Sequence, residues 1–81
     1  PFNPSTKIDI QTVERNYLKV QIVDVAGRLI NTLVDNELDA GYHVVRWNGL
    51  DASGQSMPTG MYFIQVQSGD KMNTQKIILL K

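Results

Sequence analysis

The chain has 81 residues, its eight Lys and Arg residues are balanced by eight Asp and Glu residues, and it contains no cysteine. This length suits one domain, and the neutral balance gives no support for binding nucleic acid or an anionic membrane surface, because both need an excess of positive charge. The lack of cysteine excludes disulfides, thiol nucleophiles and zinc–thiolate sites.

The first half of the chain predicts three strands. Residues 7–12 alternate polar and apolar side chains, which is the pattern of a strand with one buried face. Residues 17–25 repeat the pattern. Their inward-facing side chains are expected to be Leu18, Val20 and Ile22. Residues 29–36 are less regular and fit a strand with a bulge or one short helical turn. We favour the strand because both neighbouring segments are strands.

Turn residues separate these strands. Gly27 ends the second strand at a natural site for a positive φ. Asp24 precedes it, and we expect its carboxylate to accept hydrogen bonds from backbone N–H groups two residues further on, which fixes a turn. A second turn is predicted at residues 37–41 and ends at Gly41.

The second half of the chain predicts three more strands. Residues 42–47 alternate and end at Trp47, which is the only tryptophan and the expected largest core residue. Residues 60–68 follow a long loop. Their inward face is expected to hold Tyr62, Ile64 and Val66.

The last predicted strand, residues 71–81, follows a tight turn at residues 69–70. Its apolar run at residues 77–80 predicts that one face lies on the core and that the other is also covered, for example by another domain. Six or seven short strands with turn signals about every 8–12 residues predict an all-β fold. We expect a compact antiparallel β-sandwich of immunoglobulin-like type that uses residues 1–81 as one domain.

The long loop at residues 48–59 is the richest in turn residues. Asp51, Ser53 and Gln55 place oxygen atoms around Gly54, which suggests a calcium loop. Such a loop needs several carboxylates within about twelve residues, whereas this loop has one. We therefore favour a connector in which Asn-Gly and Ser-Gly dipeptides form turns with positive φ.

The end of this loop is expected to set the direction of the following strand. Pro58 fixes φ and favours an extended residue before it. Gly60 is expected to let the backbone turn so that Tyr62 points inward. If φ at Gly60 is positive, Gly60→Val should destabilise the domain by more than about 1 kcal/mol.

No catalytic residue, metal site or cofactor is predicted. His43 is the only histidine, it has no cysteine or second histidine beside it, and no nucleophile-elbow motif accompanies it. Lys71, Lys76 and Lys81 recur at every fifth position and so alternate between faces, where lysine normally discourages edge-to-edge pairing of strands. No apolar run approaches the roughly 18 residues of a membrane-spanning helix.

Several short motifs occur in a fixed order along the whole chain. They are NPST at residues 3–6, DVAGR at 24–28, Gly41, WNGLDASGQ at 47–55, PTGMY at 58–62 and KIILLK at 76–81. Together they resemble the type A C-terminal sorting domain of the bacterial type IX secretion system. The same ordered set of motifs is similar to that of the immunoglobulin-like domain of flagellar hook-capping proteins.

The resemblance implies a seven-stranded sandwich at the C-terminus of a larger exported protein, with no catalytic role of its own. An outer-membrane translocon would recognise the domain and carry the N-terminal cargo from the periplasm to the cell surface or the medium. In many family members a sortase-like peptidase then removes the domain and attaches the cargo to a surface lipopolysaccharide. The recognition positions matched in this chain are Pro58, Gly60, Tyr62, Lys76 and Lys81.

The alternative is an accessory immunoglobulin-like module of a secreted enzyme, with a structural or carbohydrate-contacting role. Sandwiches that bind sugars present exposed aromatic rings in a row. Tyr17 and Tyr42 are predicted to face away from the aliphatic rows, so they are the candidates. Two rings offer little surface for stacking a sugar, so we prefer the interpretation that these tyrosines pack against side chains of paired strands.

Overall fold

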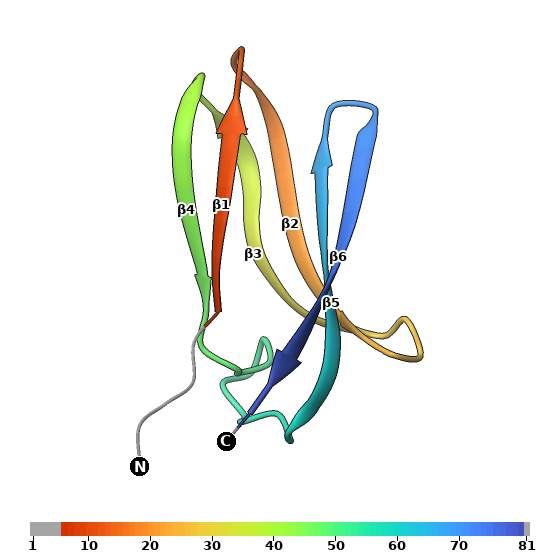
Figure 1. Ribbon diagram of the computed structural model, residues 1–81. Coiled ribbons are helices and arrows are strands. Elements are labelled where there is room, and N and C mark those ends of the chain that lie inside the picture. Colours follow the sequence, from red (N-terminus) through yellow and green to blue (C-terminus); the bar gives the residue numbers. More distant parts are fainter. Residues whose placement is uncertain (1–5, 81) are drawn as a thin grey trace.

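The computed structural model describes residues 6–80, and the described chain is built from six strands. They are β1 (Thr6–Thr12), β2 (Asn16–Asp24), β3 (Leu29–Leu38), β4 (Gly41–Trp47), β5 (Gly60–Ser68) and β6 (Lys71–Leu79). Each strand coincides with a segment predicted from the sequence, and Figure 1 shows their arrangement. The predicted all-β class is therefore confirmed, with six strands in the described part of the chain.

The strands form two antiparallel sheets. β1 pairs with β4 in a two-stranded sheet, and the other four strands form a sheet in the order β3-β2-β5-β6. The hydrophobic core takes side chains from both sheets, so the sheets pack as the two layers of a sandwich. The predicted immunoglobulin-like sandwich is confirmed in this form.

The third strand is longer than predicted. Its pairing with β2 contains two register irregularities, between Val20 and Gln21 and between Ile22 and Val23, which agrees with the predicted bulge. β3 continues to Leu38, so the turn predicted at residues 37–41 is wrong at its start. Glu37 is typical of a turn, but here it is an exposed strand residue that pairs with Tyr17.

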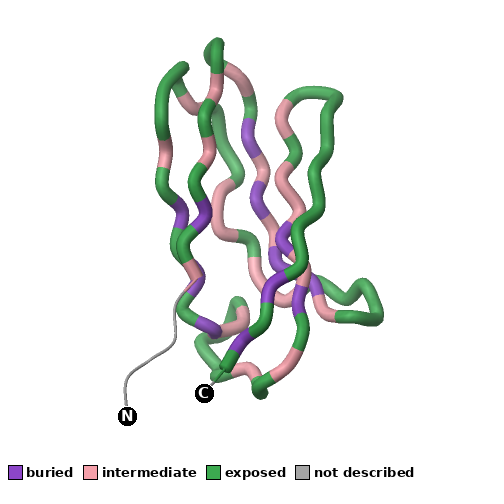
Figure 2. The backbone as a smooth tube through the Cα atoms, viewed as in Figure 1, coloured by how far each residue is buried: buried purple, intermediate pink, exposed green. Residues whose placement is uncertain are grey.

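The core follows the predicted alternation of side chains. Its buried members are Ile8, Leu18, Val20, Ile22, Val45, Trp47, Tyr62, Ile64, Ile77 and Leu79. Trp47 is fully buried, as expected for the largest side chain of the core. Figure 2 shows that burial is uneven along β6, which is exposed from residue 71 to residue 76 and buried only at Ile77 and Leu79.

The outer face of β6 is open in the described chain. Ile78 and Leu80 are 52% and 67% exposed, so residues 6–80 supply no cover for them, and cover by another domain stays a prediction. The reason is the two-layer architecture, because side chains on the far side of the four-stranded sheet have no further layer of the described chain above them. Within residues 6–80, no helix is long and apolar enough to cross a bilayer.

Candidate recognition surface

Two aromatic side chains hold the loop at residues 48–59. The Trp47 Nε1–H donates to the carbonyl oxygen of Leu50 (2.8 Å), and the Tyr62 hydroxyl donates to the carbonyl oxygen of Pro58 (2.7 Å). The two rings meet edge to face, with 5.2 Å between their centroids. The bond of Tyr62 to a carbonyl four residues upstream resembles the tyrosine corner of immunoglobulin-like sandwiches. The loop is thus anchored to the core at both ends.

The single carboxylate within the loop is used by the loop itself. Asp51 Oδ1 accepts hydrogen bonds from the Ser53 amide (3.0 Å), the Ser53 hydroxyl (2.8 Å) and the Gln55 amide (2.8 Å). These bonds hold the pKa of Asp51 below its ordinary value, and the bond from the Gln55 amide is the largest cause. Gly54 has a φ of +90°, as the connector interpretation requires. No group of three His, Cys, Asp or Glu residues in the described chain could hold a metal ion.

The loop also rests on the start of β3, which was not foreseen from the sequence. Asn31 Nδ2 donates to the carbonyl oxygen of Leu50 (3.0 Å), and the Ala52 amide donates to the carbonyl oxygen of Ile30 (3.0 Å). The carbonyl of Leu50 therefore accepts from both Asn31 and Trp47. No local signal marks Asn31, because its role depends on a contact 19 residues away in the chain.

The positive φ considered for Gly60 is found instead at Gly49, in addition to Gly54. Gly60 does not have a positive φ, and a Cβ at this position would meet no atom within 4 Å. It is an ordinary first residue of β5, paired with Leu79. Gly49 has a φ of +81°, and a Cβ there would lie 3.2 Å from the Leu79 side chain. Figure 1 shows this part of the loop beside the end of β6.

Alanine at these two glycines should therefore give opposite results. We expect Gly49→Ala to lower the free energy of unfolding by about 1–3 kcal/mol, because the backbone conformation is strained for any residue with a Cβ. We expect Gly60→Ala to leave it unchanged or to raise it by up to about 1 kcal/mol, since alanine restricts the unfolded chain. Urea titration followed by circular dichroism measures both, and equal losses would contradict the assignment.

Asp24 fixes the turn between β2 and β3 as predicted. Its Oδ1 accepts from the amides of Ala26 and Arg28 (2.9 Å each), and its Oδ2 accepts from Arg28 Nε (2.9 Å). The Arg28 amide is the largest cause that holds the pKa of Asp24 below its ordinary value. Gly27 in the same turn has a φ of +83° and Gly41, at the start of β4, one of +138°.

The lowered pKa values of Asp24 and Asp51 predict a loss of stability in acid. The unfolded chain takes up protons near the ordinary pKa of 3.8, whereas the folded chain does so at lower pH. The stabilisation is therefore complete above that value and is lost as the pH falls through the folded pKa. We expect the melting temperature to fall as the pH drops below about 4.

The variant Asp24→Asn tests this effect. It should be less stable than the wild type at neutral pH, because the ion pair with Arg28 is lost. Its melting temperature should fall less than that of the wild type as the pH drops below about 4. An unchanged slope of melting temperature against pH would contradict the role given to Asp24.

The structure divides the predicted recognition residues between two locations. Pro58, Gly60 and Tyr62 lie together where the loop meets β5, but Tyr62 is buried and can act only through the core. Lys76 lies across from Phe63 on β6 and is exposed. Lys81 lies outside the described residues, and recognition at these positions stays a prediction.

Around Lys76, the outer face of the four-stranded sheet carries a group of apolar side chains, here called the outer apolar patch. It consists of Leu29, Met61, Phe63, Ile78 and Leu80. Strand register makes the patch continuous, since Val23 pairs with both Leu29 and Phe63, and Met61 pairs with Ile78. Exposed apolar groups of this kind mark contacts with other proteins. The signal in the sequence was the unbroken apolar run at residues 77–80.

Other side chains considered for binding or catalysis are engaged locally. The pairs are Tyr17 with Asp35, Tyr42 with Asp9, and His43 Nε2 with the carbonyl oxygen of Asp39 (2.8 Å). Tyr17 and Tyr42 are exposed, as predicted, but they belong to different sheets. Because the exposed faces of the two sheets point away from each other, the two rings form no common platform for a sugar.

Comparison with known proteins gives one family and several relatives. The model of the family FlgD Ig-like domain matches residues 3–71. The basal-body rod modification proteins FlgD of Salmonella typhimurium and Salmonella typhi are each 37% identical over 49 residues, which is 60% of this chain and 21% of theirs. The crystal structure of FlgD from P. aeruginosa has a TM-score of 0.71 at 24% identity and covers 94% of this chain and 60% of that one. This chain thus spans about a fifth of the length of the curated relatives.

Proposed function

The chain belongs to the FlgD Ig-like domain family, and from this premise we propose that it is a non-catalytic C-terminal sorting domain. It directs a cargo protein, the N-terminal part of the same polypeptide, across the outer membrane through the type IX secretion system. Its partners are the outer-membrane translocon and, where the domain is cleaved, a sortase-like peptidase. The cargo passes through the periplasm and reaches the cell surface or the medium.

The outer apolar patch is the observation that carries this proposal. It places Ile78 and Leu80 in solvent beside the exposed amine of Lys76, on the strand where the family resemblance puts recognition. A sorting signal must present a surface to its receptor while the domain stays folded. The alternation in β6 meets both needs, because Ile77 and Leu79 hold the core while their neighbours face outward.

A fusion experiment tests the proposal. Residues 1–81 are joined to the C-terminus of a periplasmic reporter in a bacterium that has the type IX pathway. We expect the reporter to appear on the cell surface or in the medium, and a reporter that stays periplasmic would contradict the proposal.

The role of the outer apolar patch is tested with a matched pair of variants in the same fusion. Ile78→Glu places a charge inside the patch, and Met72→Glu places one on the same face of the same strand but at its other end. The two residues are 52% and 54% exposed, so neither change should unfold the domain. We expect export to fail for Ile78→Glu only. Circular dichroism confirms folding, and equal export of both variants would contradict a role for the patch.

The similarity to FlgD supports a second candidate, a structural module in the assembly of a flagellar rod or hook. The immunoglobulin-like fold and its charge-neutral surface suit such a role equally well. A chimaera of Salmonella FlgD that carries residues 6–80 in place of the matching region would restore motility under this second function only.

A further inference from the structure

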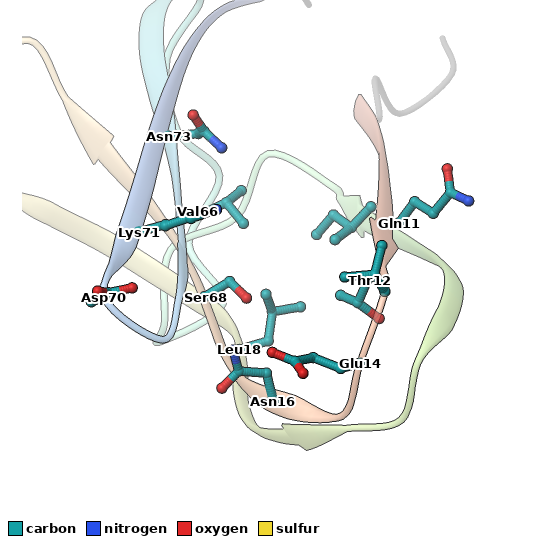
Figure 3. Close-up of a pocket in the computed structure, with 12 residues that line it drawn as sticks. Gln11, Thr12, Glu14, Asn16, Leu18, Val66, Ser68, Asp70, Lys71 and Asn73 are labelled. Atoms are coloured by element: carbon teal, nitrogen blue, oxygen red, sulfur yellow. The ribbon is translucent and has the colours of Figure 1, made fainter.

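A groove opens between β1 and the hairpin of β5 and β6. Its volume is about 340 Å³, which lies within the usual range of ligand pockets, about 300–1,000 Å³. Figure 3 shows Thr12 on the β1 side, Ser68 across from it on the side of the hairpin, and the apolar side chains of Leu18 and Val66, which form the floor. The groove thus has an apolar floor with polar walls.

The groove follows from the unequal size of the two sheets. The four-stranded sheet is opposed by a sheet of only two strands, so part of its inner face has no strand across from it. This part includes the first half of β6, where Lys71 and Asn73 point toward the groove and are exposed. Val66 on the floor and Ile10 on the β1 wall remain only partly buried for the same reason.

The β1 wall of the groove has an unpaired backbone edge. In an antiparallel pair, alternate residues direct their N–H and C=O groups toward the partner strand and the others direct them away. Among the described residues β4 is the only strand that pairs with β1, so the other edge of Thr6–Thr12 is open. An open edge is a template for one more strand, and here it stands beside an apolar floor.

We propose that this groove binds an extended segment of a partner protein, which pairs with the free edge of β1 as a third strand of the small sheet. Alternate side chains of that segment point between the sheets and contact Ile10, Leu18 and Val66. Main-chain hydrogen bonds supply affinity and the floor supplies selectivity, which is the general mode of recognition by strand addition.

The size of the groove and the charge of its rim define the occupant. A space of this volume admits a few side chains of an unpaired strand, whereas a strand of a second folded copy would bring its own sheets into collision. Glu14 and Asp70 place two carboxylates on the rim against the one amine of Lys71. The segment should therefore alternate small β-branched residues inward and include basic residues outward. This inference does not depend on the proposed secretion function.

The probe is a capped synthetic peptide, acetyl-Lys-Val-Thr-Val-Thr-Val-Lys-amide, titrated into the isotopically labelled chain and followed by NMR. We expect chemical-shift changes in β1 and in the hairpin of β5 and β6, and contacts between the peptide backbone and β1. The same peptide with its central valine replaced by proline cannot complete the ladder and should not bind. Absence of any shift at about 1 mM valine peptide, a concentration that detects even weak binding, would overturn the proposal.

Two variants on neighbouring residues locate the site. Asn73→Trp fills the groove, and Thr74→Trp places the same side chain on the opposite face of β6. Both positions are exposed, and melting curves confirm that both variants fold. We expect Asn73→Trp to weaken peptide binding by at least about tenfold, or 1.4 kcal/mol, and Thr74→Trp to leave it unchanged. Equal affinities, or a wild-type chain that dimerises through β1 in sedimentation experiments, would overturn the proposal.

Discussion

Trp47→Ala is expected to lower the free energy of unfolding by about 3–5 kcal/mol. The side chain is fully buried, its ring contacts Tyr62 edge to face, and its N–H bonds to the carbonyl of Leu50. Truncation leaves a cavity between the sheets and removes one of the two hydrogen bonds to the Leu50 carbonyl, which keeps only the bond from Asn31. A domain of this size is stable by only about 4–12 kcal/mol, so the variant should be close to unfolding at 37 °C.

Thermal melting followed by circular dichroism measures this loss. Arg46→Ala is the control, since the preceding residue of β4 is exposed and should change stability by no more than about 0.5 kcal/mol. Trp47→Phe restores most of the volume but not the donor, so it should fall between wild type and Trp47→Ala. A Trp47→Ala variant as stable as the control would refute the account of the core given above.

Leu79→Ala is expected to cost about 2–5 kcal/mol, whereas Leu80→Ala should change stability by no more than about 0.5 kcal/mol. The two leucines are neighbours, but Leu79 is 2% exposed and Leu80 is 67% exposed. Leu79 also packs against Gly49, so its loss loosens the contact between β6 and the long loop. The residue type and the substitution are the same, so a difference in stability loss comes from whether the side chain faces the core or the solvent.

Urea titration of both leucine variants provides the measurement. Equal losses would show that the register of β6 against β5 is not the one described. Under the proposed secretion function, the pair also separates two ways of losing export. Leu79→Ala would act by unfolding the domain, whereas Leu80→Ala would act with the fold intact, by removing part of the outer apolar patch.

The sequence predicted the parts of the fold that depend on local pattern. Alternation alone placed Leu18, Val20 and Ile22 inward, because side chains of a strand switch faces at every residue. The position of Asp24 before a glycine was enough to predict its turn, since the hydrogen bonds span only a few residues. The role of Trp47 followed from its size and its place at the end of a strand.

The remaining features depend on contacts between distant segments. The pairing of β1 with β4 joins distant residues, from Thr12 with Gly41 to Thr6 with Trp47, and it decides which edge is left open beside the groove. The exposure of Ile78 depends on how many layers the domain has, which an apolar run cannot reveal. The φ of Gly60 could not be predicted for a similar reason, because a proline and a glycine before a strand do not by themselves determine φ.

Trp47 has a practical consequence as the only tryptophan of the chain. Indole emission moves to longer wavelengths when the ring meets water, and here the ring is sealed between the two sheets. Its fluorescence therefore reports directly whether the sheets are together. With excitation selective for tryptophan, every variant except those at Trp47 and those that add a second indole can be followed without a label, at concentrations low enough to avoid aggregation.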